Sequence, residues 1–175
     1  CSKDVEAMLT QVQAAPGVGL DAFFKADGVA VVGASEDITK IGGRPVQLLR
    51  KYGYAGAIYP INPKGGVIQD LQAFTRLADT PIPPELAVVA VPAELALQAV
   101  RDCAQRGIKA VVVLSSGFAE AGPAGLTMQS EMTRVARSHG MRLMGPAWKA
   151  KPARASKPVS VANSVTDYSN GETTD

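Results

Sequence analysis

Residues 29–43, V-A-V-V-G-A-S-E-D-I-T-K-I-G-G, decide the fold of this 175-residue chain. A run of mostly β-branched residues up to Gly33 predicts a strand, a small polar loop with Ser35 and Lys40 follows it, and paired glycines open a helix at Gly43. This order is the unit with which α/β proteins hold phosphorylated cofactors. The loop therefore predicts an anion site, at which backbone N–H groups and the positive end of the helix face a phosphate.

The sequence as far as Met144 repeats this alternation of apolar strand and amphipathic helix. Strands separated by helices pair in parallel and are joined by right-handed crossovers, so the pattern predicts an α/β fold with a doubly wound parallel sheet, Rossmann-like. The segment 67–84 is less regular, with one helical turn predicted at 74–78. The predicted strands are 29–33, 57–61, 86–91, 110–114 and 141–144, and the predicted helices are 43–52, 93–106 and 124–139.

Apolar spacing also predicts which side chains of these helices face the sheet. The residues expected on inner faces are Val46, Leu48 and Leu49 in the first helix, Leu97, Val100 and Ala104 in the second, and Leu126, Met132, Val135 and Ala136 in the third.

Composition indicates one folded domain without a nucleic-acid or membrane partner. The chain is 46% hydrophobic and 19% charged, and its net charge is +2, with no long basic run interleaved with aromatic residues. The most apolar stretch, 86–100, is interrupted by Pro92 and Glu94 and is shorter than the roughly 20 residues of a spanning helix. These features predict a cytoplasmic protein.

Cysteine and histidine are too few for a disulfide framework or a metal cluster. The two cysteines are Cys1 and Cys103, and the single histidine is His139. Cys103 is expected to be a small buried apolar residue, and His139 to lie at a helix C-terminus. No metal site is therefore predicted.

Both ends of the sequence fall outside the repeated pattern. Residues 1–19 are expected to form a leading helix or linker, and the start at Cys1 suggests a fragment or a processed product. Residues 147–175 are polar without an apolar period, which predicts a disordered or non-native tail. The domain is therefore placed at 20–146.

The loops that follow the strands form the candidate site, because ligands of open α/β sheets bind beyond the carboxyl ends of the strands. Small side chains in these loops let backbone amides approach a ligand, while Lys40 and Lys64 supply positive charge for phosphates. The loops read G-A-S-E-D-I-T-K-I-G-G (33–43), N-P-K-G-G (62–66), V-P-A-E (91–94), S-S-G-F-A-E (115–120) and G-P (145–146).

The identity of the cofactor stays open at this level. The first loop does not match G-x-G-x-x-G, and the second strand ends in Asn62, Pro63 and Lys64, where an NAD site needs an acidic residue. A lysine there favours a phosphorylated ribose. NADP and coenzyme A both carry one, and charge alone does not separate them.

Taken together, the loops resemble the CoA-binding domain of NDP-forming acyl-CoA synthetases. This family includes ADP-forming acetate–CoA ligases and is related to the α subunit of succinyl-CoA synthetase. The resemblance covers residues 20–146 and rests on V-A-V-V-G-A-S, I-Y-P-I-N-P-K, L-A-V-V-A-V-P-A-E, A-V-V-V-L-S-S-G-F-A-E-A-G and R-L-M-G-P, in this order.

The resemblance implies coenzyme A as cofactor and assigns roles to eleven residues. The residues that match the first CoA loop are Gly33, Ala34, Ser35 and Lys40, and Lys64 matches the lysine that pairs with a CoA phosphate. The loop along the cofactor is matched by Val91, Pro92 and Ala93. The loop near the pantetheine arm is matched by Ser115, Ser116 and Gly117. The family joins a carboxylic acid to CoA at the expense of ATP, through an acyl phosphate and a phosphohistidine.

The chain departs from the family after Gly145-Pro146, where members continue into N-C and a domain with the phosphohistidine, followed by an ATP-grasp module. We therefore expect no catalytic residue in this chain, and expect those parts in cis or in trans. Two alternatives remain: a stand-alone CoA-binding or CoA-sensing module, and a fragment of an NADP-binding Rossmann oxidoreductase.

Overall fold

The computed structural model describes residues 20–145, so the expectations for segments 1–19 and 147–175 lie outside the described residues. The main sheet consists of β1 (Gly28–Val32), β2 (Ala57–Ile61), β5 (Leu86–Val89), β6 (Ala110–Val113) and β7 (Arg142–Met144). The helices are α2 (Asp21–Phe24), α3 (Gly43–Lys51), α4 (Ala93–Gln105) and α5 (Pro123–Ser138), with short 3-10 turns η1 (Leu77–Asp79) and η2 (Ala119–Ala121). All predicted strands and the three long helices are present, with ends shifted by one or two residues.

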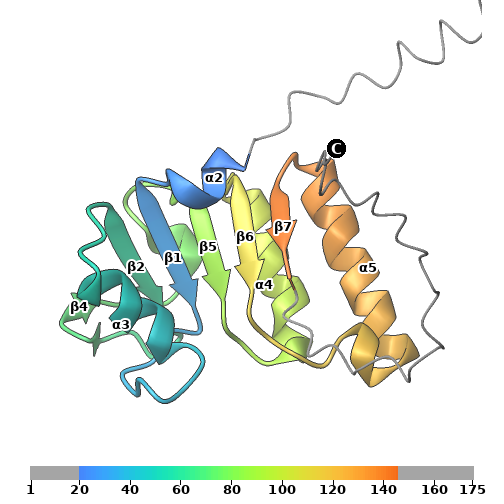
Figure 1. Ribbon diagram of the computed structural model, residues 1–175, viewed down its shortest axis with the longest axis horizontal. Coiled ribbons are helices and arrows are strands. Elements are labelled where there is room, and N and C mark those ends of the chain that lie inside the picture. Colours follow the sequence, from blue (N-terminus) through green and yellow to red (C-terminus); the bar gives the residue numbers. More distant parts are fainter. Residues whose placement is uncertain (1–19, 146–175) are drawn as a thin grey trace, which may run out of the picture.

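The five strands are parallel and lie in the order β2-β1-β5-β6-β7 (Figure 1). In β1, Val29 pairs with Ile58 of β2 and Leu86 of β5. Apolar side chains fill the central strands because parallel strands are covered on both faces. The chain adds β2 on one side of β1 and then crosses over to add β5 on the other side, so the strand order switches between β1 and β5. The carboxyl ends of these two strands open toward one crevice.

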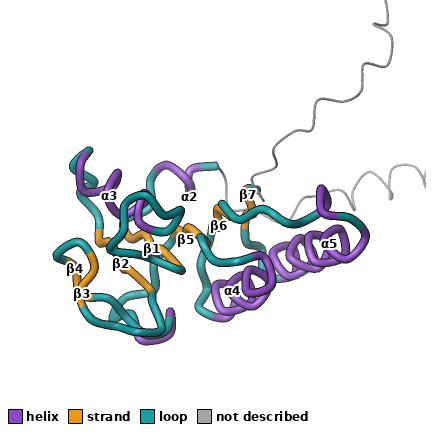
Figure 2. The backbone as a smooth tube through the Cα atoms, turned by 90° about the horizontal axis from the view of Figure 1, so that it is seen from below, coloured by secondary structure: helices purple, strands orange, loops and turns teal. Residues whose placement is uncertain are grey.

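Helices cover both faces of the sheet, which confirms the doubly wound arrangement. Figure 2 shows α3 on one side of the strands and α4 and α5 on the other. The larger core lies between the sheet and α4 and α5, where Val100, Phe118 and Met132 are completely buried. A smaller core joins the sheet to α3 through Val31 and Val46.

Two residues predicted to face inward remain exposed. Leu48 of α3 is 39% exposed and Leu126 of α5 is 53% exposed. Leu48 does point along the sheet, since it lines an apolar groove of about 540 Å³ with Val88 and Val112. The apolar period therefore identified the sheet-facing side of α3 correctly. Leu48 remains exposed because it borders a part of the sheet that α3 does not cover.

The irregular segment contains a two-stranded hairpin, β3 (Val67–Ile68) and β4 (Leu71–Gln72). Its turn residues Gln69 and Asp70 have φ of 50° and 62°, as the two-residue turns of tight hairpins require. The predicted helical turn at 74–78 is displaced: Phe74 forms a parallel bridge with Ile61, and the 3-10 turn begins at Leu77. Pairing with β2 holds Phe74 extended.

Cys103 and His139 lie as predicted. The Cys103 side chain is fully buried, and burial raises the pKa of its thiol to about 12. His139 is the C-cap of α5, where its Nδ1 lies 3.0 Å from the carbonyl oxygen of Val135. Both residues therefore belong to the framework of the fold.

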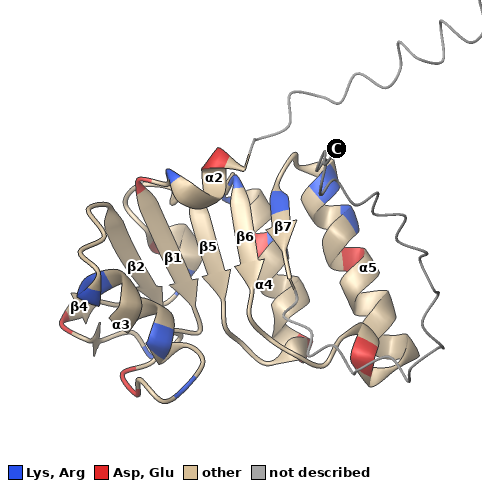
Figure 3. Ribbon diagram, viewed as in Figure 1, with Lys and Arg blue, Asp and Glu red and all other residues tan. Residues whose placement is uncertain are grey.

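In the view of Figure 3, α3 carries basic residues alone, whereas charges of both signs occur on the loop before it and on α5. Within the part of the chain that the structure describes, no helix has the length and apolar character needed to cross a membrane.

Candidate functional site

The carboxyl ends of β1, β2 and β5 surround a cleft of about 570 Å³. This volume is in the range of small-molecule sites. Its walls combine strand ends, the segment before β5 and the side of α4 that bears Leu95 and Asp102. The lining residues are Val32, Gly33, Ile61, Pro63, Thr75, Arg76, Leu77, Ala78, Val91, Leu95, Ala99, Asp102, Gln105 and Arg106.

Gly33 occupies the point of closest backbone approach in this cleft. Its φ is +87°, and a Cβ there would lie 2.6 Å from the carbonyl oxygen of Ala90. Its N–H donates to the carbonyl oxygen of Ile61 at 3.0 Å. Gly33 thus brings the ends of β1, β2 and β5 together, and only a residue without Cβ fits that geometry.

The first loop folds against the start of α3 through backbone hydrogen bonds. The carbonyl oxygen of Lys40 accepts the N–H groups of Gly43 and Arg44 at 3.1 and 3.3 Å, and Pro45 has no N–H to offer. A Cβ on Gly42 would lie 1.9 Å from the carbonyl oxygen of Gly33. Two N–H groups in the first turn of α3 are therefore engaged within the protein, and the paired glycines permit close packing.

Lys40 is exposed and lies 3.9 Å from the carboxylate of Asp37 within the same loop. Thr39 donates to Asp37 from its hydroxyl and its backbone N–H, and these bonds, with a smaller effect of Lys40, hold the Asp37 pKa below its usual value. Asp37 thus remains charged at neutral pH and offsets part of the positive charge of Lys40.

Ala34 and Ser35 hold the loop by internal contacts. Ala34 is 1% exposed in the core beneath α3, and its N–H donates to the carbonyl oxygen of Ile61 at 3.1 Å. The hydroxyl of Ser35 accepts the N–H of Asp37 at 3.1 Å. The structure thus places Ala34 away from the cleft surface and engages Ser35 in a turn.

Gln69, which sequence reasoning missed, clamps this loop from the β3–β4 turn. Its side-chain amide donates to the carbonyl oxygens of Ser35 at 3.0 Å and Gly43 at 2.9 Å. Arg50 reaches the same turn through an ion pair of 3.1 Å with Asp70. The only sequence signal of this hairpin is a pair of possible turn residues, Gln69 and Asp70, between Val67-Ile68 and Leu71-Gln72.

Lys64 stands at the tip of a tight turn that Asn62 builds. The Asn62 side chain donates to the carbonyl oxygen of Ala34 at 2.8 Å and accepts the N–H of Lys64 at 2.9 Å. The N–H of Gly65 closes the turn on the Asn62 carbonyl oxygen at 2.8 Å. Asn62 therefore joins the first and second loops, and Lys64 directly follows Pro63, which lines the cleft.

The third and fourth loops are also joined. The hydroxyl of Ser115, which is 5% exposed, donates to the carbonyl oxygen of Val91. Val91 lines the cleft, Pro92 is the N-cap of α4, and Ala93 is the first residue of that helix. Ser115 therefore supports the loop, and its hydroxyl is already engaged.

Gly117 and Ser116 form the outer part of the fourth loop. Gly117 has φ of +103°, and a Cβ there would lie 3.2 Å from the Cβ of Ala93. Glu120, for which the sequence suggested no role, accepts the N–H of Gly117 at 2.7 Å, and this bond lowers the pKa of Glu120. Ser116 is exposed at the surface of the loop.

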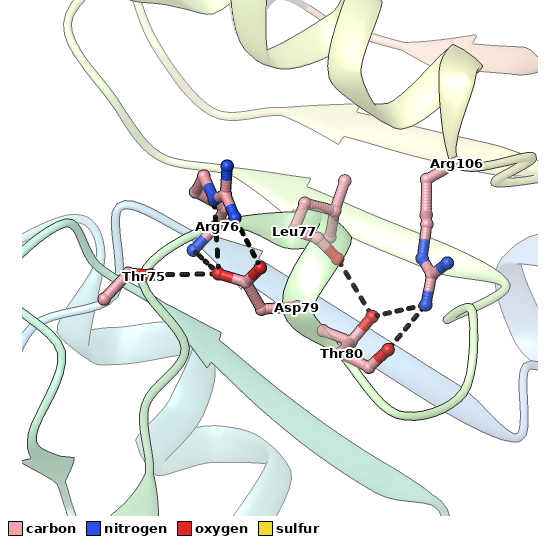
Figure 4. A network of polar contacts seen from close by, with 6 residues as sticks. All are labelled: Thr75, Arg76, Leu77, Asp79, Thr80 and Arg106. Carbon is pink, nitrogen blue, oxygen red and sulfur yellow. Dashed lines mark hydrogen bonds and ion pairs between the residues drawn. The ribbon is translucent and has the colours of Figure 1, made fainter.

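One wall of the cleft comes from the segment 75–80, for which the sequence predicted a helical turn at 74–78 but no part in the site. Figure 4 shows its polar network, in which Arg76 and Thr75 contact Asp79, and Arg106 contacts Thr80. The side chain of Leu77 is buried beneath them. No motif marked this wall, because pairing between Phe74 and the distant Ile61 brings it to the cleft.

The structure therefore brings Gly33 and Val91 to one cleft, with Lys64 beside it, and gives Ala34 and Ser115 supporting positions. An apolar cleft with cations at its rim suits an elongated ligand that has an apolar portion and phosphates. Within residues 20–145, no three His, Cys, Asp or Glu side chains gather into a possible metal site.

Comparison with known proteins agrees with this geometry. Residues 27–147 match the family described as CoA binding domain. The α subunit of ADP-forming acetate–CoA ligase I from Pyrococcus furiosus is 38% identical over 133 residues, which are 74% of this chain and 29% of that subunit. ADP-forming acetate–CoA ligase II from Archaeoglobus fulgidus is 38% identical over 123 residues, 70% of this chain and 18% of that enzyme.

A solved structure is similar over the same region. The dinucleotide forming acetyl-coenzyme A synthetase 1 of Ca. Korarchaeum cryptofilum, in complex with phosphate and ADP, has a TM-score of 0.70 and 38% identity, covering 74% of this chain and 27% of that one. The chain thus spans less than a third of the length of these three relatives. Because the family match extends over 121 of 175 residues (27 to 147 inclusive), the chain belongs to the CoA-binding domain family and is homologous to part of the ADP-forming acyl-CoA synthetases.

Proposed function

We propose that this chain is the CoA-holding domain of an NDP-forming acid–thiol ligase and that it acts in the cytoplasm. One observation carries the proposal: Gly33, Pro63 and Val91, from three different loops, line a single cleft inside the region that matches the CoA-binding family. The domain would hold CoA so that its thiol attacks an acyl phosphate, releasing phosphate and forming the thioester.

Each loop has a part in this proposal. Lys64 pairs with a phosphate of CoA, and Lys40 adds a weaker contribution because Asp37 offsets its charge. Val91, Pro92 and Ala93 lie along the cofactor. Since the Ser115 hydroxyl is engaged with Val91, the fourth loop contacts the pantetheine arm through Ser116 and the backbone of Gly117.

The remaining chemistry belongs to other parts of the proposed ligase. The overall reaction consumes a carboxylic acid, CoA and ATP and yields an acyl-CoA, ADP and phosphate. Forming the acyl phosphate requires a phosphohistidine domain and an ATP-grasp domain, supplied in the same protein or by separate subunits. The present chain then supplies the binding site of the thiol substrate.

Calorimetric titration of the 175-residue chain with CoA, dephospho-CoA and NADP tests the proposal. We expect CoA to bind more tightly than dephospho-CoA by about 5- to 150-fold, the range of a charge-assisted contact of about 1 to 3 kcal/mol. NADP should bind more weakly than CoA. Tighter binding of NADP, or no binding of CoA, would reject the proposed function.

A further inference from the structure

Arg76 stands on the wall of the cleft that no sequence motif identified. It lines the cleft together with Gly33, Pro63 and Val91, yet its side chain is 77% exposed. The guanidinium is therefore available to a ligand lying in the cleft. An arginine in this position adds to the lysines of the loops a planar group that can bind two phosphate oxygens, although Asp79 offsets part of its charge.

Asp79 holds the Arg76 side chain by one edge only. Nε and Nη2 of Arg76 contact Oδ2 and Oδ1 of Asp79 at 3.4 and 3.0 Å, and the backbone N–H of Arg76 also donates to Oδ2 at 3.1 Å. A guanidinium has a second edge, formed by its two terminal nitrogens, which can bind two oxygens of a phosphate. Asp79 orients Arg76 through Nε and one hydrogen of Nη2. The hydrogens of Nη1 and the second hydrogen of Nη2 form the other edge, which lies outside the contacts with Asp79.

Arg76 and Lys64 follow two segments that run side by side. The parallel bridge between Ile61 and Phe74 aligns the segments, and the N–H of Asn62 donates to the carbonyl oxygen of Phe74 at 2.9 Å. Beyond this point a Cβ on Gly65 would lie 3.3 Å from the Cγ2 methyl of Thr75. The turn that bears Lys64 thus packs against the residue before Arg76.

The wall itself is fixed from the opposite side. Thr80 is 3% exposed and donates from its hydroxyl to the carbonyl oxygen of Leu77 at 2.9 Å, while Arg106 of the α4 C-cap donates to the carbonyl oxygen of Thr80 at 2.5 Å (Figure 4). A segment anchored in this way has little conformational freedom left to lose. Arg76 is therefore positioned before any ligand arrives.

We propose that Arg76 is a specificity-determining residue that binds the ribose 3′-phosphate of CoA together with Lys64. The inference rests on the proposed function and adds to it the group that distinguishes CoA from dephospho-CoA. A phosphate monoester carries about −1.5 to −2 charges at neutral pH, more than either phosphorus of the diphosphate, and is the group of CoA that best matches two separate cations.

The test compares Arg76→Ala and Arg76→Gln with the wild-type chain in titrations with CoA and dephospho-CoA. Gln is neutral but keeps a side-chain N–H that can donate a hydrogen bond to Asp79, so this variant removes the charge while it preserves support of the wall. Arg134→Ala is the matched control, because Arg134 makes a similar i,i+3 pair with Glu131 on α5 and is 67% exposed. Thermal unfolding of each variant checks the fold.

Both Arg76 variants should lose about tenfold in affinity for CoA and retain the wild-type affinity for dephospho-CoA, so that the ratio between the ligands collapses. Arg134→Ala should keep the wild-type ratio. If the wild type binds CoA and a folded Arg76 variant keeps its preference over dephospho-CoA, the role of Arg76 is overturned while the proposed function stands. If the wild type binds no CoA, the proposed function itself fails.

Discussion

Gly33 and Ala90 lie in direct backbone contact where β1 and β5 end: a Cβ at position 33 would be 2.6 Å from the Ala90 carbonyl oxygen. Strands β1 and β5 are neighbours in the sheet but are distant in sequence, and their junction forms the rim of the cleft. The missing side chain at Gly33 is thus a requirement of the sheet itself, before any ligand is considered.

Gly33→Ala should lower the free energy of unfolding by more than about 2 kcal/mol, because a strained positive φ and a collision with the Ala90 backbone add together. Gly53→Ala is the matched control: Gly53 has φ of +66°, and a Cβ there would meet nothing within 4 Å, so its loss should be about 1 kcal/mol. Urea unfolding measures both, and equal losses would contradict the collision.

Lys64→Ala should weaken CoA binding by about 10- to 100-fold without changing the urea midpoint. The side chain is exposed, and the turn is held by Asn62 through contacts that the substitution leaves intact. Lys25→Ala, which removes an exposed lysine near the opposite end of β1, should bind CoA normally. An unchanged affinity in Lys64→Ala would remove Lys64 from the site.

Glu131 should make stability depend on pH in the acidic range. It pairs with Arg134 at 2.7 Å and with Arg101 of α4 at 3.3 Å, and these contacts lower its pKa from 4.5 to about 2. Because the folded-state pKa is lowered, the contribution is present above pH 4.5 and is lost as the pH falls toward 2.

The measurement is the difference in urea midpoint between the wild type and Glu131→Gln. It should be constant from pH 7 to 5 and should shrink progressively below pH 4.5. A difference that stays the same down to pH 2 would show that Glu131 is not held ionised by these arginines.

Cys103 should react with thiol reagents only after the domain unfolds, because the side chain is fully buried and burial raises its pKa to about 12. A Cys1→Ser background isolates its signal. In that background, Cys103→Ser should be less stable than Cys103→Ala by about 1 to 2 kcal/mol, since it buries a hydroxyl in an apolar core. Labelling faster than unfolding would contradict this burial.

The sheet could be predicted from sequence because each strand is a short apolar run followed by small loop residues. Leu86–Val89, for example, lies between a proline-rich connection and the start of α4, and its four residues, alternately half-buried and buried, are all apolar. The loops that surround the cleft followed directly, because the strands are parallel and their carboxyl ends share one edge.

The polar wall of the cleft could not be predicted, because its position depends on contacts between distant segments. Arg76 reaches the cleft only because Phe74 pairs with Ile61, and that pairing leaves no period in the sequence. The sequence before α3 also indicated a helix start, but it did not indicate that the N–H groups of Gly43 and Arg44 would donate to the carbonyl oxygen of Lys40.

Asn62 joins the first two loops through its side-chain amide, and the residue after it is Pro63. Asparagine side chains deamidate slowly. In this reaction the backbone nitrogen of the following residue attacks the side-chain amide carbon and closes a succinimide ring. Proline nitrogen carries no hydrogen and cannot complete this cyclisation. The amide that holds the two loops together is therefore protected by its neighbour from conversion to aspartate during prolonged incubation.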